Sequence, residues 1–172
     1  MLLAAPTLRR RMAAFTYEGV LLFGVVMIFG YLYSALTQQR HALEGRIGLQ
    51  LFLFLVLGIY FAWFWSRGGQ TLAMKTWRVR LVTTTGGAVP QGRALARYLV
   101  SWVWLLPPFA LGHALGWHSG AGLFGLMLLW IVLYALTSFT HPQRQFWHDA
   151  LCGTRLIPAE VPAGTPVAGV QP

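Results

Sequence analysis

The 172-residue sequence is poor in charged residues, and acidic residues are especially scarce. Only 10% of the residues are charged, and only four are acidic. A soluble domain usually carries about a quarter charged residues, so this composition, with 56% hydrophobic residues, excludes an ordinary soluble fold. The shortage of acids also leaves a formal net charge of +9. The sequence therefore predicts a membrane protein with an excess of positive charge.

Cysteine is almost absent as well. Cys152 is the only cysteine, which excludes an intramolecular disulfide and any multi-cysteine metal site. His113 and His118 flank a glycine at a spacing that matches no recognisable ligand pair, so we expect no metal and no cofactor. The N-terminal basic cluster is followed by an apolar run without a small-residue cleavage pattern, which is not typical of a signal peptide. We expect this first apolar run to remain in the protein.

Long apolar segments are what the chain has in abundance. A span must cross about 30 Å of hydrocarbon at about 1.5 Å per residue. Four segments are long enough, at residues 12–36, 47–65, 99–117 and 121–139. The third contains Pro107 and Pro108 at its centre, which predicts a kink or break there. The sequence thus predicts an all-α membrane protein with four transmembrane helices.

Basic residues are unevenly divided among the connections between these segments. The N-terminal arm has three, the second loop six and the C-terminal tail two, against two in the first loop and none in the third. With four spans the three richer regions share one side, which the positive-inside rule identifies as cytoplasmic. We therefore expect a multi-pass protein of a bacterial-type inner membrane with both termini in the cytoplasm. The position of these bases beside apolar segments favours anionic lipid headgroups as partners and argues against nucleic acid.

The second loop has its own structural signals. Residues 70–76 favour a short interfacial helix, and residues 77–82 alternate apolar and polar side chains as a strand does. A turn at 85–87 followed by 88–90 predicts a small cytoplasmic β-hairpin. A lone hairpin is marginally stable, so we expect residues 154–157 to add a third strand. The domain then extends over residues 1–157, and residues 158–172 form a disordered tail.

Glu18 is an acid inside the first predicted span. It follows Arg11 by seven residues, which places both on one helix face about 10 Å apart along the axis. An ionised, unpaired carboxylate at that depth costs at least a few kcal/mol, so it should be protonated, paired or in contact with water. Two interpretations remain open. Glu18 either binds a proton or cation linked to solute movement, or it forms a structural pair with Arg11, Arg93 or Arg97.

Near the C-terminus, His148 and Asp149 precede Cys152. Adjacent residues rarely hydrogen-bond in the geometry that a general base and its orienting group need, so a catalytic set is not indicated. We expect no catalytic residues and no enzymatic activity. Asp149 is better interpreted as the electrostatic counterpart of the basic second loop, with His148 anchoring the chain where it leaves the membrane.

Three motifs together resemble the RDD family of small membrane proteins over about residues 6–157. The first is Arg11 followed by Glu18, and the second is Gly68-Gly69-Gln70-Thr71 after the second span. The third is the segment that contains His148, Asp149, Gly153 and Thr154. The resemblance implies that Arg11, Glu18 and Asp149 are the arginine and two acids that name the family. The sequence departs from the family pattern at Glu18, which replaces an aspartate, and at Cys152, where serine is commoner.

The resemblance implies a role in transport and no enzymatic activity. Two functions are therefore considered. One is transport or exchange of a cation or small solute by the Glu18 carboxylate, in a homo-oligomer because one acid in four helices makes a small path. Gln50 is the other polar side chain within the spans that favours this function. The second is a non-catalytic accessory or regulatory subunit that packs against a larger membrane complex through its aromatic and glycine faces.

Overall fold

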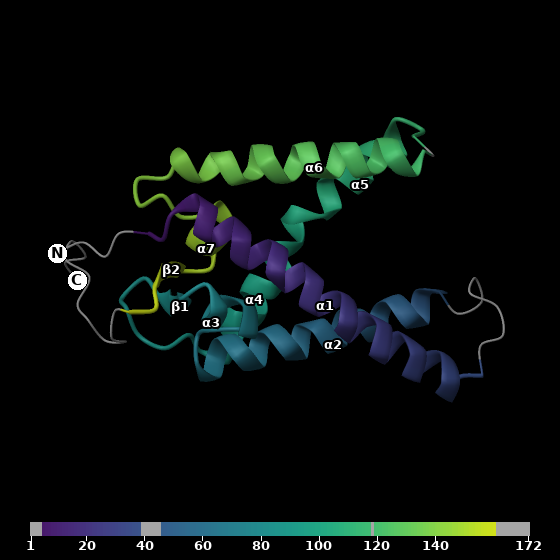
Figure 1. Cartoon of the computed structure of the whole chain (residues 1–172), viewed down its shortest axis with the longest axis horizontal. Coiled ribbons are helices and arrows are strands. Elements are labelled where there is room, and N and C mark those ends of the chain that lie inside the picture. The colour runs from purple at the N-terminus through teal and green to yellow at the C-terminus, as the bar shows by residue number, and fades with distance from the viewer. Residues whose placement is uncertain (1–4, 39–45, 118, 161–172) are drawn as a thin grey trace.

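The computed structural model describes residues 5–38, 46–117 and 119–160. Its elements are, in chain order, α1 (Leu8–Leu36), α2 (Arg46–Arg67), α3 (Leu72–Thr76), β1 (Val79–Thr83), α4 (Gln91–Ser101), the 3-10 helix η1 (Trp102–Trp104), α5 (Leu106–Ala114), α6 (Gly120–Leu136), the 3-10 helix η2 (Thr137–Phe139), α7 (Trp147–Leu151) and β2 (Thr154–Pro158). The short elements α3, β1, α7 and β2 gather at the end where α1 begins (Figure 1). We call this end the sheet end.

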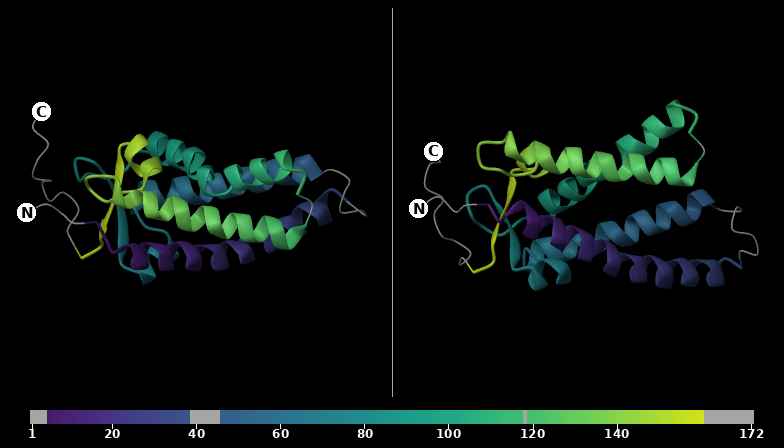
Figure 2. Two further views of the ribbon diagram at one scale, coloured as in Figure 1. Left: turned by 90° about the horizontal axis from the view of Figure 1, so that it is seen from above. Right: turned by 45° about the horizontal axis from the view of Figure 1, so that its top comes forward.

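Within the described residues, four helical segments are long and apolar enough to span a membrane, which confirms the predicted architecture. They cover Leu8–Leu36, Arg46–Arg67, Gln91–Ala114 and Gly120–Phe139. The third begins at Gln91 rather than at residue 99, because the amphipathic helix α4 runs directly into the apolar segment. The α1–α2 and α5–α6 pairs both extend away from the sheet end (Figure 2). Helix α1 begins and strand β2 ends at the sheet end, as an even number of spans between them requires (Figure 1).

The third span is broken, but not at the position that the sequence predicted. The α-helical geometry gives way to η1 at Trp102–Trp104, and Leu105 then leaves the helical region with φ −120°. Pro107 and Pro108 follow as the first residues of α5 after Leu106. Proline lacks an N–H and is tolerated where the first helical N–H groups have no partner, so here the prolines start a helix instead of kinking one.

The small sheet joins the second loop to the C-terminal region. Strand β1 pairs antiparallel with β2, and Leu81 lies opposite Leu156. This confirms that residues 154–157 pair with the loop strand. The predicted hairpin is wrong, because residues 88–90 form no strand and only a turn closes there, with Thr83 N–H donating to Gly87 O at 3.0 Å. The predicted strand start at residue 77 is also wrong. Arg78 has φ +49°, which is not strand geometry, and the strand begins at Val79.

The predicted domain boundary at residue 157 falls inside a structured segment. Strand β2 includes Pro158, and Ala159 N–H donates to Arg78 O at 2.8 Å. The Glu160 carboxylate lies 3.3 Å from Arg10 and 3.6 Å from Arg78. Contacts with the domain therefore continue to Glu160. The rest of the predicted disordered tail, residues 161–172, lies outside the described residues.

The hydrophobic core lies at the sheet end, where the spans meet the short elements. It includes Trp65, Leu81, Tyr98, Trp104 and Leu156, all less than 9% exposed. Aromatic residues near the ends of membrane spans are often interpreted as a belt at the membrane surface. Trp63, which is 50% exposed, fits that interpretation, but Trp65, Tyr98 and Trp104 are core residues. The aromatic side chains instead build the compartment that encloses the buried charges.

Candidate functional site

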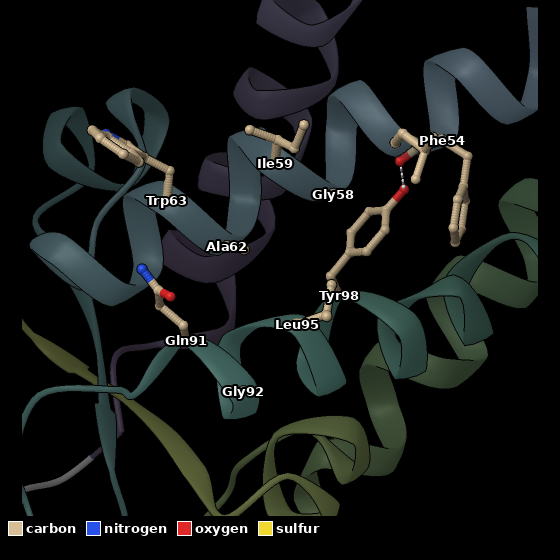
Figure 3. Close-up of a pocket in the computed structure, with 10 residues that line it drawn as sticks. Phe54, Gly58, Ile59, Ala62, Trp63, Gln91, Gly92, Leu95 and Tyr98 are labelled. Atoms are coloured by element: carbon tan, nitrogen blue, oxygen red, sulfur yellow. Dashed lines mark hydrogen bonds between the residues drawn. The ribbon is translucent and has the colours of Figure 1, made fainter.

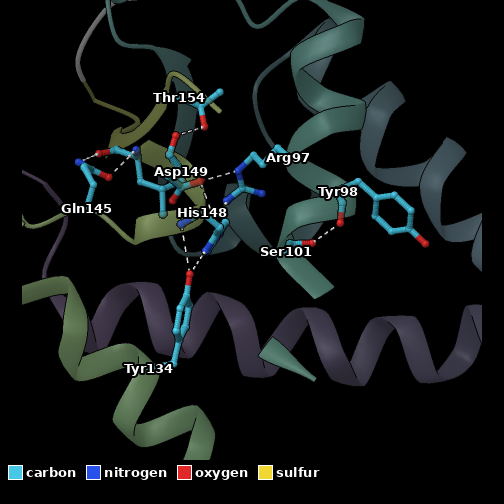
Figure 4. Close-up of polar contacts among 9 residues, drawn as sticks. Arg97, Tyr98, Ser101, Tyr134, Gln145, His148, Asp149 and Thr154 are labelled. Carbon is cyan, nitrogen blue, oxygen red and sulfur yellow. Dashed lines mark hydrogen bonds and ion pairs between the residues drawn. The ribbon is translucent and has the colours of Figure 1, made fainter. Parts of the chain in front are cut away.

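Asp149 is fully buried at the sheet end and pairs with Arg97. Its Oδ1 lies 2.6 Å from Arg97 Nε (Figure 4). The Arg97 guanidinium stacks over the Trp65 ring at 4.1 Å. Burial by itself would raise the pKa of Asp149, but the charge and hydrogen bond of Arg97, together with the charge of Arg11, outweigh it and hold that pKa below its usual value. Asp149 therefore stays ionised. Asp149 was expected to be the electrostatic counterpart of the basic second loop, and it forms an ion pair with one residue of that loop, Arg97.

His148 is buried beside this pair and is held by Tyr134. The backbone N–H of His148 donates to the Tyr134 hydroxyl oxygen at 3.2 Å, and that hydroxyl lies 3.0 Å from His148 Nδ1. The tautomer of the imidazole decides whether the hydroxyl donates to Nδ1 or accepts from it. Nε2 faces Asp149 Oδ1 at 3.5 Å. Burial, assisted by Arg97, lowers the pKa of His148 to about 4 despite the opposing effect of Asp149.

His148 is therefore a neutral core residue. The sequence placed it at the membrane exit as an anchor, and that interpretation is wrong because its side chain is only 3% exposed. Cys152, close by in sequence, is half-buried, and burial raises the pKa of its thiol. A protonated thiol is a poor nucleophile.

Arg11 belongs to the same buried region, although no acid pairs with it directly among the described residues. It lies one turn into α1, and its Nη2 donates to Ser138 Oγ at 3.4 Å. Its guanidinium also stands 4.4 Å from the centre of the Phe146 ring. Nε and Nη1 have no hydrogen-bond acceptor within the described part of the chain. The side chain thus contributes charge near Asp149 while keeping two donors uncommitted.

Glu18 occupies a separate position with a different kind of partner. Its Oε1 accepts a hydrogen bond from Tyr60 Oη at 2.7 Å, and its Oε2 accepts from Thr71 Oγ1. Within the described residues no arginine or lysine lies within ion-pair distance of it. The charge of Arg97 still acts on it from further away. Glu18 therefore faces the protein interior, as predicted, but hydroxyl groups hold it instead of Arg11, Arg93 or Arg97.

The Gly68-Gly69-Gln70-Thr71 motif positions Thr71 for this contact. Gly69 has φ +68°, and its carbonyl accepts from Leu81 N–H at 2.7 Å. The Gln70 side chain donates from Nε2 to Val79 O at 2.7 Å, which fixes the loop to β1. Thr71 Oγ1 accepts from Met74 N–H at 3.2 Å and so caps α3 while its proton reaches Glu18. Gly68 has open space where a Cβ would be, so no contact there requires glycine.

Gly153 and Thr154 fix the path of the chain between α7 and β2. Gly153 has φ +63°, a conformation that glycine adopts without strain, and it turns the chain into β2. Thr154 Oγ1 then donates to the backbone O of Asp149 at 3.2 Å. Gln145, a residue that the sequence analysis missed, holds the same strand by two hydrogen bonds to the backbone of Leu156. Its Nε2 donates to Leu156 O at 3.0 Å, and its Oε1 accepts from Leu156 N–H at 2.9 Å. Together these bonds hold α7, and with it Asp149, against the sheet.

The three signature residues thus belong to two adjoining groups. The first, which we call the arginine network, contains Arg11, Arg97, Tyr134, His148 and Asp149. The second, the Glu18 site, contains Glu18, Tyr60 and Thr71. Tyr60 and Tyr134 were missed by sequence reasoning, because a tyrosine near the end of a span is also what a membrane-surface belt contains. Gln50 is exposed on α2 and takes no part in either group.

Comparisons with known proteins identify a family. No curated protein and no solved structure gives a match to the chain. A family model described as the RDD family matches residues 5–153, a range that includes all three signature residues, the Gly68-Gly69-Gln70-Thr71 motif, Gly153 and the four spans. This match covers well over half of the sequence. The chain therefore belongs to the RDD family.

Proposed function

We propose that this membrane protein moves a cation or small solute across the bilayer and that Glu18 is the carboxylate that exchanges a proton or cation. The observation that carries this proposal is the set of partners around Glu18. Tyr60 and Thr71 both donate hydroxyl hydrogen bonds to it, and no basic side chain forms an ion pair with it in the described residues.

Oxygen-only surroundings suit exchange for a chemical reason. Carboxylate and hydroxyl oxygens are the ligands that hard cations prefer. A hydroxyl can donate to an ionised carboxylate and can turn its lone pairs toward a cation when one arrives. A fixed arginine would instead neutralise the carboxylate permanently. Glu18 is therefore free to be neutralised by a proton or by a cation.

Asp149 provides the internal contrast. Its carboxylate is committed to Arg97 at 2.6 Å and is fully buried, so a mobile cation would have to displace a fixed one. Truncating one partner of a buried ion pair typically costs about 3–5 kcal/mol. This supports a structural role for Asp149 and leaves Glu18 as the exchangeable acid.

The test is flux in proteoliposomes with Glu18→Gln. The amide keeps the size of the side chain. Its oxygen accepts from one hydroxyl and its NH2 group donates to the other, but it cannot cycle a proton. We expect pH-gradient-driven uptake of Na⁺ or K⁺ by the wild type and loss of that uptake in Glu18→Gln. Tyr60→Phe and Thr71→Val should each weaken uptake by removing one oxygen.

Glu160→Gln is the matched control, because Glu160 is exposed and forms only surface ion pairs. It should transport as the wild type does. Equal flux in Glu18→Gln and the wild type would contradict the proposal, as would a folded wild type that moves no tested ion.

A second candidate is a non-catalytic accessory subunit, and one feature of α1 favours it. Gly24 and Gly30 have open space where a Cβ would be, so no helix packs closely against them within the described chain. Phe23, Met27 and Tyr31 beside them are all more than half exposed. Such a surface can accept another transmembrane helix. Co-purification with a larger complex, without any flux, would favour this function.

A further inference from the structure

An open apolar groove runs between α2 and α4. It has a volume of about 420 Å³, within the range of small-ligand sites of roughly 300–1,000 Å³. Its walls are formed by Phe54, Ala62 and Trp63 of α2 and by Leu95 and Tyr98 of α4 (Figure 3). The groove belongs neither to the arginine network nor to the Glu18 site.

The packing of α2 against α4 explains why the groove exists. Gly58 allows the Tyr98 ring to approach closely, since a Cβ there would lie 3.1 Å from Tyr98 Cε1. Tyr98 Oη then donates to the Phe54 carbonyl at 2.7 Å, which fixes one end of the groove. Toward the other end, Gly92 has no atom within 4 Å of the position of a Cβ. The helices thus touch at Gly58 and leave space beside Gly92.

The end of the groove near the sheet end is polar and basic. Trp63 and Gln91 lie together at this end, opposite Phe54 (Figure 3). Arg67 follows Trp63 by one helical turn, and its guanidinium stands 3.7 Å from the Trp63 ring centre. Arg67 is exposed, and no acid forms an ion pair with it among the described residues. An apolar channel therefore leads to an available positive charge at the end of a span.

We propose that this groove binds one anionic glycerophospholipid. An acyl chain lies along the apolar walls, and the phosphate meets Arg67 and the Gln91 amide at the polar end. Both helices belong to membrane spans, so the walls face acyl chains and Arg67 reaches headgroup depth. The charge is complementary, because the protein carries a net charge of +9 and most of its bases lie at the sheet end. An apolar helix of a second copy in the groove would leave Arg67 without an anionic partner and Gln91 without a polar one, so a lipid fits the groove better.

The test uses native mass spectrometry of the full-length protein in detergent, titrated with dioleoylphosphatidylglycerol or dioleoylphosphatidylcholine. The two lipids share acyl chains and differ in headgroup charge. We expect the wild type to retain one phosphatidylglycerol in preference to phosphatidylcholine. Arg67→Gln should lower phosphatidylglycerol retention about fivefold, the effect of one basic residue near a headgroup, and should leave phosphatidylcholine retention unchanged. Gly92→Leu should fill the groove and lower retention of both lipids.

Two controls separate the groove from the general surface. Arg9→Gln removes an exposed arginine at the same end, and Gly125→Leu adds the same side chain at an exposed glycine of α6 that also has open space. Neither should change lipid retention, and circular dichroism should be unchanged in all four variants. Equal retention of the two lipids by the wild type would overturn the proposal. So would equal losses in Arg67→Gln and Arg9→Gln, or a shift in the monomer–dimer balance of Gly92→Leu without a change in lipid.

Discussion

At the scale of single residues, the two buried carboxylates have different kinds of partner: hydroxyl groups hold Glu18, and an arginine holds Asp149. The cost of burying a charge was enough to predict that Glu18 faces the interior and has partners. Their identity was not predictable, because Tyr60 and Thr71 come from other helices and hydroxyl donors leave no charge pattern in the sequence. The kind of partner that Asp149 has was easier to predict, since one acidic residue near many basic residues is expected to pair with one of them. The structure places it on Arg97.

The buried His148 predicts how stability changes with pH. Its pKa is about 4 in the folded protein and about 6.5 when unfolded, so the unfolded state binds more protons between these values. Stability should therefore fall as the pH drops from about 6.5 to about 4, by about 3 kcal/mol at most. The pKa of Asp149 is lowered from 3.8, so its ion pair is lost only at still lower pH. Thermal unfolding in detergent between pH 7 and pH 4 measures the effect.

The groups around the imidazole determine the controls for this experiment. Arg97, Asp149 and Tyr134 all contact it, so a substitution should keep their charges unchanged. His148→Gln removes the titrating group and should flatten the profile between pH 6.5 and pH 4. His141→Gln, a histidine outside the arginine network, should keep the slope of the wild type. An identical slope in His148→Gln would show that another group is responsible.

At the scale of secondary-structure elements, the local sequence pattern predicted the two strands but misplaced the break in the third span. The alternation in residues 77–82 and 154–157 gave the two strands, and their pairing followed from the instability of a lone hairpin. The break in the third span was expected at Pro107 and Pro108, the strongest local signal. It lies earlier because Trp104 is packed in the core against Tyr134 and Phe146, and such tertiary contacts cannot be read from local sequence.

Gly69 offers a sharp test of the connection between α2 and β1. Its φ of +68° is unfavourable for any residue with a side chain, and a Cβ there would collide with the carbonyl oxygen of Leu81. The N–H of the same leucine donates to Gly69 O. Gly69→Ala should lower the free energy of unfolding by at least about 1 kcal/mol, because it adds strain and displaces β1. Gly68→Ala is the control, since its Cβ would meet no atom within 4 Å. Equal melting temperatures for the two variants in detergent would contradict this account.

At the scale of the whole molecule, the distribution of charge decides how the protein sits in the bilayer. The arginine network and the sheet tie the N-terminal arm, the second loop and the C-terminal region to one end. These three regions carry eleven of the 13 basic residues. Translocating so many bases is unfavourable, so we expect the sheet end to remain in the cytoplasm. Such an orientation also places Arg67 in the leaflet where anionic lipids attract basic residues.

Single-cysteine labelling in a Cys152→Ser background tests this orientation. Arg78→Cys reports the sheet end, where the Arg78 side chain is 72% exposed and forms only a surface ion pair, so the exchange should cost less than about 1 kcal/mol. Arg40→Cys reports the first loop, which lies outside the described residues. In intact spheroplasts an impermeant maleimide should label position 40 alone, and permeabilisation should expose position 78. Arg144→Cys should behave as Arg78→Cys does, because an even number of spans returns the chain to the same side. Labelling of positions 40 and 78 from one side would rule out the four-span topology, and external labelling of position 78 alone would invert it.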